Sequence, residues 1–471
     1  MGPSLGSVLS IATLLFKAAY GYDQNDETLY LANFANITSQ SHSFVDDNNV
    51  PPGLVTNCVD QGKLSAPLVD VTIATSTTSS QVQALCGVET HCIIPQGVKV
   101  IMDSDLNVGA LTLLDGGELE WKDSPEGGAT SHYLCAGYII SSGSASTFHV
   151  DLTSEPDSTG FIYIKNNGAK PAAVDMMGER VLGTYNGGNM IVKGREKART
   201  WTLLSEPLGV GESSMKVIHD VSQMGWKVGD RIGVAPTEHG SAGKASTFII
   251  SAITNSFTIE LSHPNSNDKP YGSAFINGQS SSPPVLKAAE VVNLSRNILI
   301  TGDDFEHIPC DPSITSSSET SSVGCKCSAT RTKCTVGLHT IHHSHPSPSP
   351  GTMQISNTKV EKCGQRGIEG KYCLHFHKSG DCPQCVFEKN AVEFGHHRGI
   401  TVHGTHRSTV THNVGEKFTF IIIYILTSCL AFFSLDYLVC LQRINTQSGT
   451  SAGQTITLKT VTRCIMNSRS M

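Results

Sequence analysis

The chain has 471 residues and a formal net charge of −7, from 34 basic and 41 acidic side chains. This acidic balance excludes a typical nucleic-acid binder, because contacts with phosphates need a basic face. Charged residues form only 16% of the chain, which disfavours long amphipathic helices and coiled coils. Fifteen cysteines indicate an oxidising compartment, where disulfides persist, and their odd number leaves at least one without a partner in the chain.

The first 21 residues are predicted to be a secretory signal peptide. An apolar run over 8–16 precedes small residues that end at Gly21. A buried N-terminal strand or helix is the alternative interpretation. Residues 22–80 follow as an N-terminal segment. Sequons begin at Asn36 and Asn293, and both are candidate glycosylation sites of a secreted chain.

The next region, up to about residue 309, is predicted to be all-β. Short β-rich runs alternate with glycines, and no helical period of apolar residues is sustained. The clearest expected strands cover 98–102, 110–114, 161–164 and 189–192.

Acidic side chains gather in one part of this region. They are candidate ligands for Ca²⁺, which prefers oxygen donors: Asp103, Asp105, Asp115, Glu118 and Glu120. Strand alternation places Glu118 and Glu120 on one face, and a pair of carboxylates is the arrangement that cleaves glycosidic bonds. A solvated strand face is the structural alternative.

An insertion and a repeat follow. Residues 310–351 are rich in Cys, Ser and Pro and are predicted to be a loop-like insertion. Within 352–414, the pair Val360-Glu361 recurs 32 residues later as Val392-Glu393. Repetition of strand, turn and strand predicts successive coils of a right-handed parallel β-helix, in which equivalent positions stack.

Histidines are concentrated in the same part of the chain, with eleven of the 19 between 339 and 412. In a strand, His375 and His377 project to the same face, and a neighbouring coil brings His403 close to them. Three imidazoles suit Zn²⁺ or another transition metal, or general acid–base catalysis on a bound sugar. The structural alternative is a stacked histidine ladder that satisfies the turns of the coils.

Twelve cysteines fall into three groups of four and are candidate disulfide partners. Cys382 and Cys385 have the spacing of a redox or zinc site, but no βαβ setting surrounds them, so a structural disulfide is favoured. The groups are Cys58, Cys86, Cys92 and Cys135; Cys310, Cys325, Cys327 and Cys334; and Cys363, Cys373, Cys382 and Cys385. The other three cysteines lie in the C-terminal tail.

The tail begins with an apolar run over 418–441 that is long enough to span a membrane. A polar segment, 442–471, follows it. Three interpretations compete for this end of the chain: a single membrane anchor, a buried segment, and a tail foreign to the rest of the architecture.

Motifs spread over residues 80–414 resemble one known family of proteins. Residues 92–100 and 111–119 resemble the G-eight domain, an extracellular β module named for its eight glycines. Residues 226–237 resemble the segment that follows it, and 289–298 resemble the entry to a β-helix. Residues 371–377 and 390–406 resemble parallel β-helix coils. Fibrocystin, fibrocystin-like receptors and the cell-migration-inducing hyaluronan-binding proteins share this order.

The resemblance implies an all-β fold with a G-eight domain at 81–205, a β-rich connecting region at 206–309 and β-helix coils at 352–414. In this family further coils are expected, but the sequence after residue 414 does not resemble them.

The expected protein is a secreted or cell-surface ectodomain. It binds an extracellular, hyaluronan-like glycosaminoglycan, and hydrolysis of that glycan is a candidate activity. His375, His377 and His403 are the candidate catalytic or metal-binding residues, with Zn²⁺ or Ca²⁺ as the candidate cofactor. The alternative function is that of a receptor-like or adhesion protein without catalysis.

Overall fold

The computed structural model describes most of the chain between residues 62 and 418. The described residues are 58, 62–124, 128–171, 176–237, 246–267, 269–276, 285–314, 324–327, 332–344, 351–418, 423–426 and 438–441. The predicted signal peptide, the Asn36 sequon and the polar segment 442–471 lie outside these residues.

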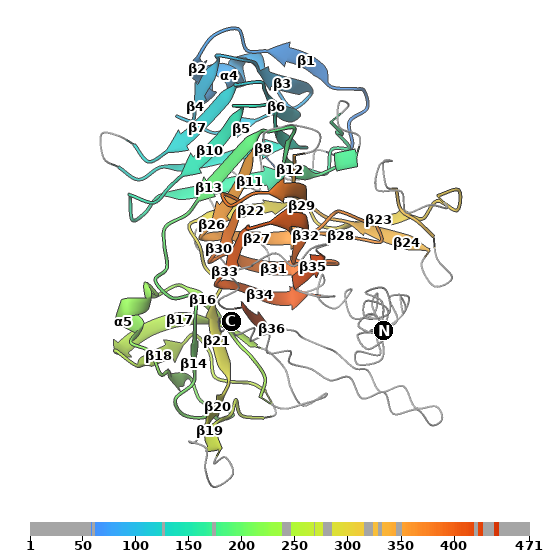
Figure 1. Cartoon of the computed structure of the whole chain (residues 1–471). Helices are drawn as coiled ribbons and strands as arrows, with labels where there is room; N and C mark the ends of the chain where they lie inside the picture. The colour runs from blue at the N-terminus through green and yellow to red at the C-terminus, as the bar shows by residue number, and fades with distance from the viewer. Residues whose placement is uncertain are drawn as a thin grey trace, which may run out of the picture.

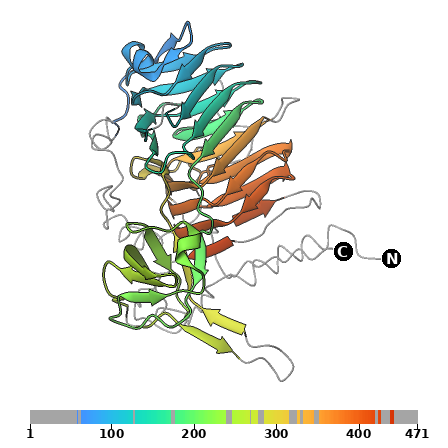
Figure 2. The same ribbon diagram turned by 90° about the vertical axis from the view of Figure 1, so that its left-hand side faces the viewer.

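Three long parallel sheets stack coil upon coil into a β-helix, as Figures 1 and 2 show. Sheet A contains, in spatial order, β1 (Val69–Thr72), β3 (Thr90–Ile94), β6 (Ala110–Leu114), β9 (Ile139–Ser142), β12 (Val181–Tyr185), β25 (His339–His343), β29 (Leu374–Asp381), β32 (Ile400–His406) and β35 (Ile423–Leu426). Sheet B contains β2 (Thr77–Thr78), β4 (Lys99–Ile101), β7 (Glu118–Lys122), β10 (Thr147–Asp151), β13 (Asn189–Lys193), β26 (Thr352–Ser356), β30 (Val386–Glu388) and β33 (Thr409–Thr411). Sheet C contains β5 (Leu106–Asn107), β8 (Ser131–Ala136), β11 (Thr159–Ile164), β22 (Ile298–Gly302), β27 (Thr358–Cys363), β31 (Ala391–Gly395), β34 (Asn413–Phe418) and β36 (Leu438–Leu441).

Alternation along each strand builds the core. Inward side chains are aliphatic or aromatic and repeat at the same position of successive coils, as Leu119, Phe148 and Met190 do in sheet B. Because a single coil cannot bury its own inner face, each coil is stable only when stacked between neighbours. Short α4 (Ser79–Leu85) packs against the first coils and buries Val82.

Two insertions interrupt the coils. The larger one is an antiparallel domain between β13 and β22, with β14 (Trp201–Leu203), β15 (Ser214–Lys216), α5 (Val221–Met224), β16 (Arg231–Val234), β17 (Ser246–Asn255), β18 (Thr258–Leu261), β19 (Ser273–Ile276), β20 (Val285–Ala288) and β21 (Glu290–Asn293). It has a core of its own, and Figure 2 shows it beside the lower coils. The smaller one is a hairpin of β23 (Glu306–Pro309) and β24 (Lys333–Val336), to which β28 (Gln365–Arg366) adds a strand.

The expected all-β fold with a parallel β-helix is confirmed, and so are the four clearest strands. The strands of 81–205 continue directly into the later coils, since β12 and β13 pair with β25 and β26. The sequence alone did not indicate that the early and late coils form one continuous stack, because the two inserted segments separate them along the chain.

The coils also extend further than expected. β35 pairs with β32, and β36 pairs with β34, so paired strands occur beyond residue 414 and inside the apolar run 418–441. Among the residues that the structure describes, no helix is long and apolar enough to cross a membrane.

All twelve candidate cysteines form disulfides, and every bond lies within one of the three expected groups. The pairs are Cys58–Cys135, Cys86–Cys92, Cys310–Cys327, Cys325–Cys334, Cys363–Cys373 and Cys382–Cys385. Six bonds in one solenoid fit an oxidising compartment.

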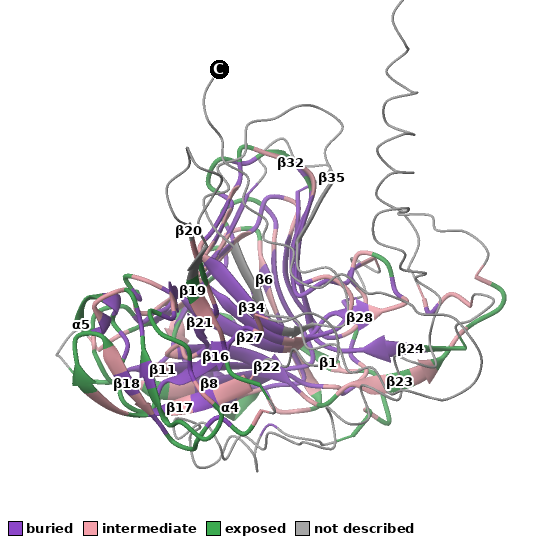
Figure 3. Cartoon of the chain, turned by 90° about the horizontal axis from the view of Figure 1, so that it is seen from below, coloured by how far each residue is buried: buried purple, intermediate pink, exposed green. Residues whose placement is uncertain are grey.

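The outer faces of the three sheets differ in exposure. Sheet A is covered in its middle coils by the segment around Ala169 and Met177, which packs on Tyr138 and Ile341. Sheet C is covered by the inserted domain, whose Trp201 and neighbours pack on Ala391 and Val414 of the coils. In β7, β10 and β13 of sheet B, buried and accessible side chains alternate along the strand. In sheet C, by contrast, β22 and β27 are buried almost throughout, as Figure 3 shows.

Candidate functional site

The three histidines expected to act together do converge in the structure. His375 and His377 lie on β29, and His403 lies directly opposite His377 on β32 of the next coil. One ring nitrogen of each residue lies within 4.8 Å of those of the other two. The reason is the two-residue period of the strand combined with the in-register stacking of coils.

The rings of His377 and His403 also belong to a longer ladder on the outer face of sheet A. The stack runs through Tyr185, His343, His377 and His403, which occupy one register position on four successive coils. The ring centroids of neighbours lie 5.7, 5.2 and 5.0 Å apart. Spacing between coils therefore sets the spacing of the rings, as expected for stacked strands about 4.8 Å apart.

His375 and His377 are neutral at physiological pH. Burial lowers the pKa of His377 to about 3, with a further contribution from His343. Burial also lowers the pKa of His375 well below its usual value, and His377 adds to the effect. A group with so low a pKa is a poor proton donor at neutral pH, but its lone pair remains available to a ligand.

The tautomer of His375 follows from its hydrogen bond. Its Nδ1 lies 3.0 Å from the carbonyl oxygen of Gly370, which can only accept, so Nδ1 carries the proton. The lone pair is therefore on Nε2, which is buried and has no hydrogen-bond partner. Nδ1 of His377 is likewise buried without a hydrogen-bond partner. Both atoms are suited to ligation rather than to satisfying a turn.

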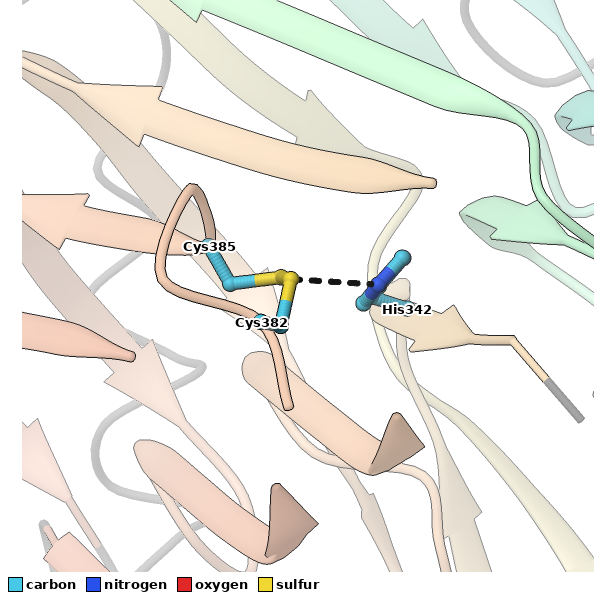
Figure 4. Close-up of side chains that lie close together, drawn as sticks. All are labelled: His342, Cys382 and Cys385. Carbon is cyan, nitrogen blue, oxygen red and sulfur yellow. Dashed lines mark hydrogen bonds between the residues drawn. A yellow bond between two sulfur atoms is a disulfide. The ribbon is translucent and has the colours of Figure 1, made fainter. Parts of the chain in front are cut away.

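A second group of metal-type residues lies on the inner face of the same sheet. His342 points toward the Cys382–Cys385 disulfide, with its Nε2 3.9 Å from the Cys382 sulfur (Figure 4). Its Nδ1 is 2.5 Å from the Thr184 hydroxyl, and burial lowers its pKa to about 3. Because the sulfurs are bonded to each other, they are not thiolate ligands, and the disulfide favoured by the sequence is what the structure contains.

The acidic candidates are not brought together. Among the described residues, the groups that could hold a metal contain no Asp or Glu. Asp103 accepts hydrogen bonds from Ser79 and Ser80 at the start of α4. Glu120 lies 3.2 Å from Lys99 and 2.7 Å from Lys122, and its bond with Lys122 lowers the pKa of its carboxyl. The structural alternative of a solvated strand face therefore describes Glu118 and Glu120, which both lie on the outer face of β7.

The sequon at Asn293 requires a correction. The side chain is fully buried between the inserted domain and the coils. Its Nδ2, the atom that a glycan would occupy, donates a hydrogen bond of 2.7 Å to Asp230. The folded protein therefore does not present this sequon to solvent. A tripeptide motif carries no information on burial, which explains the difference.

One surface was missed from the sequence. The outward side chains of sheet B form three columns that run along the solenoid and are polar except at Ile101, Ile191 and Val386 of the middle column. They are Lys99, Glu118, Thr147 and Asn189; Glu120, His149, Ile191 and Gln354; and Lys122, Asp151, Lys193, Ser356 and Glu388. Their polar period of two is visible in the sequence, but only the coil register shows that they align.

Two family matches cover these regions. Residues 80–205 match the G8 domain, and residues 337–419 match the CEMIP beta-helix. The chain carries a G8 domain and a CEMIP β-helix. The G8 domain corresponds to the coils from β3 to β13, and the CEMIP β-helix to those from β25 to β34. The inserted antiparallel domain lies between the two matched regions from β15 to β21, and its first strand, β14, lies at the end of the G8 match.

Whole-chain similarity is modest. The chain is 24% identical to mouse Fibrocystin-L (Mus musculus) over 334 residues, which cover 68% of this chain and 8% of that protein. It is also 24% identical to Communication mutant protein F of Dictyostelium discoideum over 239 residues, 50% of this chain and 17% of that protein. The chain thus spans a small fraction of the length of these relatives. Among solved structures, the Gp54 tailspike of Acinetobacter baumannii bacteriophage AP22, in complex with capsular saccharide, shares 9% identity at a TM-score of 0.17, covering 64% of this chain and 42% of that one.

Proposed function

We propose that this chain is an extracellular ectodomain that binds a glycan along the outer face of sheet B. The observation that carries the proposal is the set of three polar columns, which present hydroxyl, amide, imidazole and charged groups at the spacing of the coils. Sugars are recognised by such hydrogen-bonding groups fixed on a rigid scaffold. A linear polymer lying along the solenoid axis meets polar side chains on each successive coil.

Exposure favours sheet B over the other two sheets. Outward side chains such as His149, Ile191 and Gln354 remain partly accessible, whereas the outward side chains of β25 and β22 are buried. A polymer can therefore approach sheet B without displacing any described part of the chain.

Binding without hydrolysis is the better supported activity. Hydrolysis of a glycosidic bond needs a general acid, which is a carboxyl group with a raised pKa. The pKa of Glu120 is instead lowered by its lysine partners. The neutral histidines of sheet A are not proton donors at neutral pH either. The six disulfides and the similarity to Fibrocystin-L support the extracellular assignment.

Hyaluronan is the first glycan to test, with a neutral polysaccharide as comparison. We expect the purified full chain to bind, and we expect Gln354→Ala combined with His149→Ala to weaken binding about thirtyfold, since each of the two lost hydrogen bonds removes about 1 kcal/mol. Lys216→Ala, on an exposed strand of the inserted domain, is the control and should leave affinity unchanged. Polymer length after incubation reports hydrolysis separately. Equal affinity of the double variant and the native chain would contradict the placement on sheet B.

The second candidate function is adhesion to another protein through the inserted domain. Apolar side chains stand exposed there, namely Val210, Ile218, Val228 and Phe257. If the chain acts by adhesion, we expect that glycans do not bind. We also expect that Phe257→Ser reduces capture of the chain by cells that express the protein partner.

A further inference from the structure

We propose that His375, His377 and His403 form a binding site for a transition-metal ion such as Zn²⁺ on the outer face of sheet A. This inference goes beyond glycan binding and does not depend on it, because the two sites lie on different sheets. The cluster supplies three ligand nitrogens within 4.8 Å of one another. Three protein imidazoles with one open position form a recurrent zinc arrangement.

The ligand atoms are prepared for a metal. Nε2 of His375 is buried and has no hydrogen-bond partner, although a buried polar nitrogen without a partner is costly. Its opposite nitrogen is fixed by the Gly370 carbonyl, which is the outer contact that normally orients a metal-binding histidine. A metal would remove the cost of the orphaned nitrogen.

The scaffold also favours ligation. Two ligands come from one strand and the third from the paired residue on the next coil, so the backbone fixes their relative positions. In a tetrahedral zinc site the ligand nitrogens lie about 3.3 Å apart, so the rings need only small rotations to close on an ion. His403 is partly accessible, which gives the ion a route to the site.

The chemistry of the cluster selects the class of metal. Imidazole nitrogen suits Zn²⁺, Cu²⁺ or Ni²⁺, whereas Ca²⁺ and Mg²⁺ require oxygen ligands. Lys371 and Lys378 contribute positive potential at His377. A bound dication next to these lysines therefore favours an anionic fourth ligand, such as hydroxide or a carboxylate, at the open position.

The structural alternative is a ladder of rings without a metal. It explains the stacking of His343 on His377, at 5.2 Å and 20° between ring planes. It does not explain why one ring nitrogen of each of the three residues lies within 4.8 Å of the other two, or why Nε2 of His375 is buried without a hydrogen-bond partner.

The test uses the full chain, produced without a polyhistidine tag, stripped with a chelator and kept under non-reducing conditions. Titration with Zn²⁺ alone should give one ion per chain by calorimetry, and Co²⁺ should give the visible absorption of a tetrahedral site. Ca²⁺ should not compete. Loss of the hydrogen bond that orients a metal-binding side chain weakens metal affinity about 10- to 100-fold. Removal of the metal-binding side chain itself should therefore weaken Zn²⁺ affinity by at least about 100-fold.

Two variants and a matched control make the test decisive. His375→Gln and His403→Gln should both lose the Zn²⁺ site. If His375→Gln, at the more buried position, fails to fold, the result for His403→Gln decides the test. His396→Gln is the control, because His396 is equally buried but lies on the sheet C side of the coil and should leave Zn²⁺ affinity unchanged. Absence of a stoichiometric site in the native chain, or unchanged affinity in both cluster variants, overturns the proposal. Glycan binding measured on the same variants should be unaffected, which separates the two proposals.

Discussion

Histidines define the chemistry of this chain at the scale of single residues. Burial holds the pKa values of His342 and His377 near 3, and it lowers those of His339, His375 and His396 well below the usual value. In the unfolded chain the same residues titrate near pH 6.5. Protonation therefore favours the unfolded state over the interval between these values.

We predict that the protein loses stability as the pH falls from 6.5 toward 5. In this window the unfolded chain binds protons that the folded chain does not, so the free energy of unfolding falls by up to about 1.4 kcal/mol per pH unit for each such histidine. Urea unfolding between pH 7.5 and 5 measures the effect. His342→Gln should show a shallower dependence than the native chain, and a flat profile in the native chain would contradict the prediction.

At the scale of elements, turns between sheets A and B depend on glycine. A Cβ atom at Gly188 would lie 2.1 Å from the carbonyl oxygen of Ser141 on the preceding coil, and one at Gly117 would lie 2.0 Å from that of Ile94. Backbones of adjacent coils approach so closely there that no side chain fits between them. Glycine punctuation in the sequence thus reflects coil stacking as well as turn conformation.

We predict that Gly188→Ala destabilises the protein by about 3 kcal/mol, because backbone rather than a flexible side chain blocks the new methyl group. Gly87→Ala is the matched control, since nothing lies within 4 Å of its added Cβ. Chemical denaturation of both variants checks this. Similar unfolding midpoints for the two would show that the coils can separate to admit a side chain.

For the whole molecule, a buried ion pair joins the inserted domain to the coils. Nη1 of Arg231, on β16, donates to both carboxylate oxygens of Glu393 on β31, at 2.8 and 3.0 Å. Lys359 on β27 lies 3.3 Å from the same carboxylate. The glutamate has no exposed surface. Glu393 of the repeated Val-Glu pair therefore adds a buried ionic contact to the apolar packing between the insertion and sheet C.

We predict that Glu393→Gln destabilises the protein by about 3 kcal/mol, because it removes the charged partner of the buried Arg231, whereas Lys359 keeps Glu361 at 3.1 Å. Glu206→Gln, which breaks the exposed pair with Lys216, should cost less than about 1 kcal/mol. Hydrogen exchange should show early opening of β14 and β21 in the Glu393 variant. Unchanged protection of these strands would mean that the apolar contacts alone hold the domain.

Local sequence patterns predicted much of the fold. Two-residue alternation and glycine spacing gave the strands, and the repeat at residues 360 and 392 gave the stacking of β27 on β31. The pairing of His377 with His403 was predictable on the same grounds. Cysteine grouping predicted the three sets within which the disulfides form, but not the pairs, since Cys58 and Cys135 are 77 residues apart and only the fold brings them together. The burial of the Asn293 sequon and the alignment of the columns on sheet B were not predictable, because both depend on which face of each sheet is covered.

The sequence by itself determined an all-β, disulfide-bonded solenoid with a histidine-rich wall, because strand periodicity and cysteine grouping are local properties. Tertiary structure decided that the G8 domain and the CEMIP β-helix are one continuous stack, that Asn293 is buried, and that sheet B is the accessible face. These features depend on contacts between residues far apart in the chain. β12, for example, meets β25 only after about 150 intervening residues have folded aside as insertions and other coils.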